Sequence, residues 1–164
     1  MPEIQHHPLL FTFRDAVSGN GFLAGVTISG RALMEQDEEG AWWMYGVRPG
    51  GIAESGAAPE ATFLNFRNRY KEVLFDIAEE CPTFEVFKQE VERFFYEPDE
   101  AEEQRWEDAL RLVRQSPAAL PDPFSKMERK TPDTMPAGVS VARLDQSARL
   151  RPSDNVRDVY ATAA

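Results

Sequence analysis

The sequence predicts an α+β fold: a small antiparallel β-meander packed by one long helix, with two accessory helices and an extended C-terminal arm. Three observations predict this class. Apolar and polar residues alternate in short segments over residues 8–47, as in β-strands. Apolar residues then recur at three- and four-residue steps over residues 59–115, as in amphipathic helices. After residue 115 prolines and polar residues become frequent, which is typical of an extended linker.

Three or four strands are predicted for the meander. Residues 8–17 and 22–29 flank a cluster of the Asn-Gly kind, which closes hairpins. Residues 42–47 follow an acidic turn and carry bulky side chains on both faces, which indicates a central strand. Gly30 permits a bend or a bulge after the second strand. Four further glycines are expected to form a tight loop from the third strand into the first helix: Gly46, Gly50, Gly51 and Gly56.

The helices are predicted from their start signals and their apolar stripes. The first begins near Pro59 and ends at Cys81-Pro82. Arg67 is expected to lie largely off its apolar stripe, and Thr83 and Asp99 are the expected N-caps of the two accessory helices. We expect the helices to cover one face of the sheet. The stripe of the first helix comprises Phe63, Phe66, Tyr70, Val73, Leu74 and Ile77.

We predict one folded domain over residues 1–115, followed by a proline-rich linker and an extended or disordered C-terminal arm over residues 116–164. Two short elements are expected within the arm. Val139, Val141 and Leu144 indicate a short strand. Val156, Val159 and Tyr160 indicate a short helical turn.

The charge of the chain is unevenly distributed. The net charge is −10, but residues 126–164 hold seven basic and five acidic side chains, so residues 1–125 carry −12. An acidic body of this kind suits a basic partner protein and is not expected to attract nucleic acid or anionic membrane nonspecifically.

One cysteine, Cys81, excludes an internal disulfide and any zinc site built from several cysteines. No apolar segment approaches the length of a membrane span and no charged-then-apolar leader is present, so we expect a cytoplasmic protein. No cofactor is expected.

Aromatic residues supply the first candidate interface. Alternation along the third strand places Trp42 and Met44 on one face of the sheet and Trp43 and Tyr45 on the other. If helices cover a single face, one of these pairs forms an exposed apolar patch, suited to a partner or to a second copy in an oligomer. Burial under the C-terminal arm is the competing interpretation.

Charged residues complete the set of candidate partner-binding residues. Asp37, Glu38 and Glu39 form an acidic turn that is typical of a solvated hairpin and is also suited to arginines on a basic partner. The mildly basic arm contributes Arg143, Arg149 and Arg151 and resembles a segment that folds on a partner.

The order of these motifs resembles the HicB-like antitoxin family over about residues 22–80. The resemblance is carried by Asp37-Glu-Glu-Gly40, Trp42–Val47, Pro49–Ile52, Gly56 and Pro59–Ala61. It implies a truncated ribonuclease H-like fold without catalysis, cofactor or metal, which neutralises a small basic RNA-cleaving toxin of the HicA type. The chain departs from the family at Ala58, where threonine is usual, and in the two helices over residues 83–115. It has no convincing C-terminal DNA-binding module, so the resemblance leaves operator binding open.

Two alternatives from other classes remain. One is a structural or adaptor subunit that docks on a larger assembly through its C-terminal arm. The other is a metal-dependent nuclease, for which carboxylates must converge from separate strands, as Asp15, Glu35 and Asp37 could.

Overall fold

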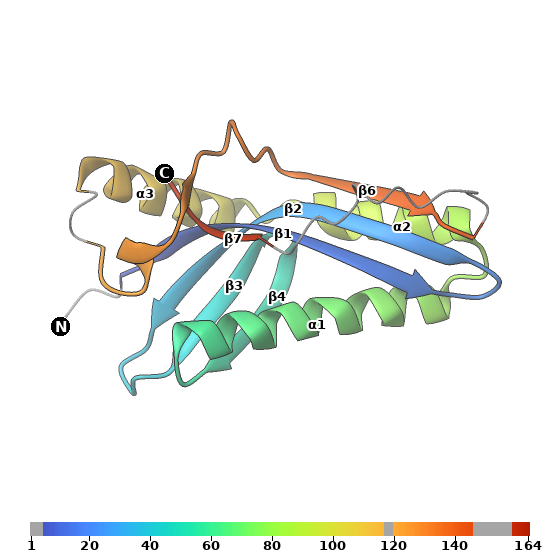
Figure 1. Ribbon diagram of the computed structural model, residues 1–164, viewed down its shortest axis with the longest axis horizontal. Helices are drawn as coiled ribbons and strands as arrows, with labels where there is room; N and C mark the ends of the chain where they lie inside the picture. Colours follow the sequence, from blue (N-terminus) through green and yellow to red (C-terminus); the bar gives the residue numbers. More distant parts are fainter. Residues whose placement is uncertain (1–4, 117–119, 146–158) are drawn as a thin grey trace.

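The computed structural model (Figure 1) describes residues 5–116, 120–145 and 159–164 and has the α+β architecture that the sequence predicts. Its strands are β1 His7–Ser18, β2 Leu23–Gln36, β3 Trp42–Arg48, β4 Gly50–Gly56, β5 Arg129–Lys130, β6 Gly138–Arg143 and β7 Val159–Ala163. Its helices are α1 Pro59–Glu80, α2 Phe84–Tyr96 and α3 Glu100–Gln115, followed by a 3₁₀ turn at Phe124–Lys126. The strands form one mostly antiparallel sheet in the order β4-β3-β2-β1-β7-β5, and β6 also pairs with β2.

Strand β2 is the centre of this sheet because it is long enough to have two neighbours on one side. It pairs along its length with β1, while its first half pairs with β6 and its second half with β3. The register shifts by one residue between Arg31 and Ala32, next to Gly30, and the extra residue is Val47 of β3. The bulge expected at Gly30 therefore lies on the neighbouring strand, and β2 continues to Gln36. A Cβ on Gly30 would lie 2.3 Å from the Phe11 ring and 2.5 Å from the Arg48 carbonyl oxygen, and only glycine fits there.

The loop expected between the third strand and the first helix is instead a strand, β4. Val47 pairs with Gly50 across a tight turn, and Gly51 takes a positive φ of 78° that favours glycine. Ile52 is buried and Ala53 is exposed, so the segment alternates as an edge strand does. The glycines therefore shape a hairpin, and the chain reaches α1 only after Gly56.

The helices lie on both faces of the sheet, which corrects the expectation of a single covered face (Figure 1). Helices α1 and α2 pack on the face that carries Phe11, Phe13 and Val141. Helix α3 packs on the opposite face, because Leu10, Leu33 and Val47 form a second apolar area there. The α3 residues that bury this area are Trp106, Ala109 and Leu110.

The expected ends of the helices are confirmed. Helix α1 begins at Pro59 and ends before Cys81. The Thr83 side chain accepts a hydrogen bond from the Val86 N–H, and the Asp99 side chain accepts one from the Glu102 N–H. No helix in the described ranges combines the length and the apolar character needed to cross a bilayer.

The chain beyond α3 continues the same sheet. The strand expected around Val139 is confirmed as β6, and β7 pairs with β1. Val159 and Tyr160 lie in β7 and not in the expected helical turn, and Val156 falls outside the described residues. Phe124 is fully buried against His7, with ring centroids 4.0 Å apart. Gln115 thus ends α3, and the sheet takes further strands from the arm.

Candidate partner-binding surface

The acidic turn between β2 and β3 is held together by Asp37. One Asp37 carboxylate oxygen accepts hydrogen bonds from the N–H groups of Glu39 and Ala41, at 3.0 and 2.9 Å. The other accepts the indole N–H of Trp43 at 3.0 Å. The bond from Trp43, together with those from the turn, lowers the pKa of Asp37 below its usual value. Asp37 therefore positions Trp43, and it leaves Glu38 and Glu39 exposed at the tip of the turn.

Trp43 and Tyr45 form a stacked pair on the sheet face that α3 covers in part. Their ring centroids are 6.1 Å apart and the rings are inclined by 15°. Both side chains are half-buried, whereas Met44 between them is fully buried on the α1 face. The alternation expected for this strand is therefore confirmed, and α3 leaves the two rings in contact with solvent.

Carboxylates flank this aromatic pair on two sides. Tyr45 is hydrogen-bonded to Glu35, and burial together with the nearby charges of Glu35 and Glu102 raises the pKa of Tyr45. Glu35 also contacts His6, with 2.7 Å between His6 Nδ1 and the carboxylate. The stacked rings thus lie within a negatively charged surround. We call the following residues the acid–aromatic surface: Glu35, Glu38, Glu39, Trp43, Tyr45 and Glu102.

The structure does not bring the basic candidate Arg143 to this surface. Arg143 pairs across the sheet with Ala24, twelve residues before Gln36 on β2, which corresponds to roughly 40 Å along a strand. Its guanidinium binds Asp145 and the Gly21 carbonyl oxygen and lies 5.9 Å from the Phe84 ring. Arg149 and Arg151 lie outside the described residues.

The three carboxylates considered for a nuclease-type metal site do not converge. Asp15 lies on the α1 face, where both its oxygens bind Arg67, whereas Glu35 lies on the α3 face beside His6. Asp37 is engaged by its own turn and by Trp43. Within residues 5–116, 120–145 and 159–164, no three His, Cys, Asp or Glu side chains gather as metal ligands. The expectation that these carboxylates could converge is therefore corrected. Side chains alternate between the two faces along a strand, and the positions of Asp15 and Glu35 place them on opposite faces.

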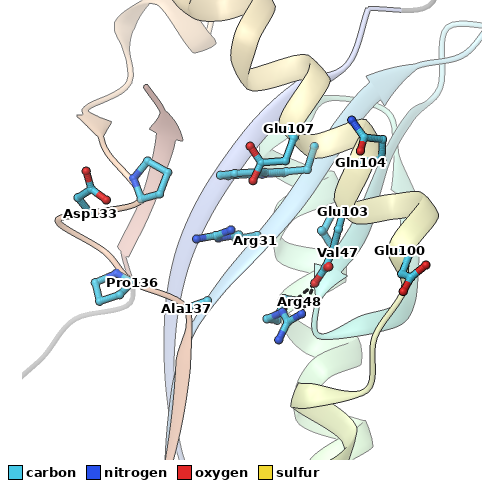
Figure 2. A pocket seen from close by; sticks show the side chains of 12 residues that line it. Arg31, Val47, Arg48, Glu100, Glu103, Gln104, Glu107, Asp133, Pro136 and Ala137 are labelled. Atoms are coloured by element: carbon cyan, nitrogen blue, oxygen red, sulfur yellow. Dashed lines mark hydrogen bonds and ion pairs between the residues drawn. The ribbon is translucent and has the colours of Figure 1, made fainter.

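A cavity of about 900 Å³ lies on the other flank of α3, between that helix, the β2–β3 bulge and residues 132–137 (Figure 2). Arg31 of β2 and Arg48 of β3 are direct cross-strand partners and both line it. Arg48 donates to Glu103, at 3.1 Å from Nε. The Arg31 guanidinium instead lies over the Trp106 ring, 4.6 Å from its centroid. The sequence contained a signal for the place of Arg31 on the α3 face. Arg31, Leu33 and Glu35 are spaced two residues apart on β2, so their side chains lie on the same face of the sheet.

Comparison of the chain with protein-family models, with curated proteins and with solved structures found no match. The function proposed below therefore rests on the residues and on the geometry of the acid–aromatic surface.

Proposed function

We propose that the protein is a non-enzymatic binding module that recognises a basic partner protein through its acid–aromatic surface. More specifically, we propose an antitoxin-like inhibitor of a small basic RNA-cleaving toxin. One observation carries the proposal: the stacked, half-buried rings of Trp43 and Tyr45 lie among carboxylates on a body that bears a charge of −12 over residues 1–125.

This arrangement suits arginine and lysine side chains of a partner. A guanidinium can lie on an aromatic face and bind a carboxylate at the same time, and arginine and tryptophan are both enriched among the residues that dominate interface energies. Asp37 fixes the Trp43 indole through a 3.0 Å hydrogen bond. Such preorganisation reduces the entropy that is lost when a partner binds.

The adaptor alternative receives less support from the described part of the arm. Strands β6 and β7 are paired with β2 and β1, and Phe124 is buried against His7. Segments that complete the protein's own sheet are not available for docking without opening that sheet. We therefore favour binding through the folded body.

The proposal is tested with the full chain as bait in its own cells, because truncation after α3 would remove β6 and β7 from the sheet. Proteins that co-purify are identified by mass spectrometry, and any small basic protein among them is assayed for RNA cleavage with and without the chain. We expect a small basic ribonuclease whose cleavage of RNA stops at a stoichiometric amount of the chain.

Two results would count against the proposal. Co-purification of a large assembly without a small basic protein would favour the adaptor function. RNA cleavage that continues at saturating amounts of the chain would exclude inhibition even if the two proteins bind.

A further inference from the structure

Arg31 and Arg48 bring two positive charges to the floor of the cavity beside α3. They face one another directly across β2 and β3, and like charges in this position destabilise a sheet. Glu103 is hydrogen-bonded to Arg48 through both Nε and Nη2. Arg31 forms no hydrogen bond or ion pair with another described residue, and its Nε is buried without an acceptor. A buried, unpaired donor calls for an acceptor that the described chain does not supply.

The rim of the cavity carries the opposite charge. Glu100, Glu107 and Asp133 line it and are exposed, with Glu100 and Glu107 on α3 and Asp133 on the facing loop. In Figure 2 the Arg31 side chain extends from its strand toward Pro136 and Asp133, between α3 and that loop. A ligand that reaches Arg31 therefore passes between carboxylates.

We propose that this cavity binds a zwitterionic ligand: a carboxylate pairs with Arg31 beside Trp106, and a cationic group of the same ligand lies among the rim carboxylates. A carboxylate fits the guanidinium in a two-bond geometry. A doubly charged phosphate fits less well, because three rim carboxylates repel it. The volume of about 900 Å³ is that of a ligand pocket and not of a packing defect. The inference does not depend on the proposed partner protein, which binds on the other flank of α3.

Two kinds of molecule carry a carboxylate together with a cationic group in this way: the C-terminus of a peptide and a free amino acid. The test uses acetyl-glycyl-lysine with a free C-terminal carboxylate, the same dipeptide as its C-terminal amide, and free L-lysine. Binding is followed by the indole N–H signals of the three tryptophans in nitrogen-15 NMR spectra of the full chain, with Trp106 assigned from a Trp106→Phe sample.

We expect the acid dipeptide or lysine to shift the Trp106 signal saturably, and we expect the amide to bind at least tenfold more weakly. Tighter binding of the acid dipeptide would identify a peptide C-terminus as the ligand, and tighter binding of lysine would identify a free amino acid. No saturable shift with either compound would overturn the proposal, as would equal binding of the acid and the amide. Tighter binding of inorganic phosphate than of both compounds would also overturn it.

Two variants test the residues. Arg31→Met keeps an apolar side chain on Trp106 and is expected to weaken binding at least tenfold without lowering the melting temperature, because it also removes a like-charge pair. Arg111→Met changes an exposed arginine of α3 outside the cavity and is the matched control. A purely structural Arg31 predicts the reverse, a lower melting temperature with unchanged binding. The exposed pair Glu107→Gln with Asp133→Asn provides a second test that does not alter the core, and binding unchanged by it would contradict the cationic half of the site.

Discussion

Asp15 of β1 and Arg67 of α1 form a buried ion pair that joins the sheet to its longest helix across 52 residues of sequence. Two hydrogen bonds of 2.9 Å connect them, and their side chains are 5 and 8% exposed. The Arg67 guanidinium also donates to the Arg14 carbonyl oxygen and lies 4.5 Å from the centre of the Phe13 ring. Such a pair is stable only because its hydrogen bonds are satisfied.

Removal of either partner should destabilise the fold strongly. Asp15→Asn or Arg67→Met is expected to lower the free energy of unfolding by about 3–5 kcal/mol, because the remaining group stays buried without its partner. Urea denaturation at pH 7 measures the change, with the exposed Asp76→Asn as control. The double variant Asp15→Leu with Arg67→Met should be more stable than either single variant. A loss below about 1 kcal/mol in both single variants would refute this account of the pair.

His7 makes the stability depend on pH in a defined window. Its side chain is 3% exposed and stacks on Phe124, and burial, followed by the charge of His6, lowers the pKa of His7 from 6.5 to about 4. The unfolded chain therefore binds a proton between pH 6.5 and 4 that the folded chain does not bind. The contribution of His7 is complete above pH 6.5 and is lost as the pH falls toward 4, by roughly 3 kcal/mol in all.

His7→Phe tests this linkage because it keeps an aromatic ring on Phe124 and removes the titration. Denaturation curves at pH 7 and pH 4 should show a smaller loss of stability on acidification in the variant than in the parent protein. Carboxylates titrate in both proteins, so only the difference between the two losses is informative. Equal losses of stability would show that His7 takes up its proton in the folded protein as readily as in the unfolded chain between pH 7 and pH 4, and this would contradict the linkage.

Gly30→Ala should destabilise the sheet where β1, β2 and β3 meet. The added methyl group would overlap the Phe11 ring and the Arg48 carbonyl oxygen, at 2.3 and 2.5 Å. Overpacking of this kind costs about 1–3 kcal/mol. Thermal unfolding measures the effect, and Gly138→Ala is the matched control because no atom lies within 4 Å of the corresponding Cβ. Similar melting temperatures for the two variants would contradict the steric explanation.

Local sequence signals predicted those features that are determined by residues close to one another in the chain. The Asn-Gly turn and the helix caps at Thr83 and Asp99 depend on neighbours a few residues away, and each is found where expected. The expected stripe of α1 is confirmed in part: Phe66, Tyr70 and Leu74 are buried, whereas Phe63, Val73 and Ile77 are half-buried. The other buried residues of α1 are Thr62, Arg67 and Ala78. The alternation over Trp42–Tyr45 likewise separated the two faces of β3 correctly.

Long-range pairing explains most of what the sequence did not reveal. Five of the seven residues of strand β4 are glycine, alanine or serine, so the segment resembles a loop until β3 provides its hydrogen bonds. Arg67 appears as a solvated helix residue until Asp15 is placed beneath it from β1. The pairing of β7 with β1 joins residues about 150 positions apart, which no local pattern encodes.

The candidate site likewise has one part that the local sequence predicts and another part that depends on long-range packing. The turn with Glu38 and Glu39 and the strand with Trp43 and Tyr45 are adjacent in sequence, so their association was predictable. Glu102 of α3 reaches Tyr45 only because α3 packs on the second face of the sheet. Arg31 and Trp106 meet for the same reason.

The central claim is that the acid–aromatic surface binds a basic partner protein. Its most direct test is the affinity of the basic protein that co-purifies with the chain, measured by calorimetry against the intact chain and three variants. Trp43→Ala should cost about 2 kcal/mol or more, roughly a thirtyfold loss of affinity. Glu38→Gln with Glu39→Gln should weaken binding at low salt and matter less at high salt.

The control carries the same loss of charge at the far end of the sheet. Glu79→Gln with Glu80→Gln changes two exposed carboxylates at the end of α1, where Asn20 of the β1–β2 turn binds the Glu79 carbonyl oxygen. We expect an affinity within about twofold of the intact chain for this control and clear losses for the other two variants. Equal losses in the two charge variants, or full affinity in Trp43→Ala, would contradict the claim that this surface is the binding site.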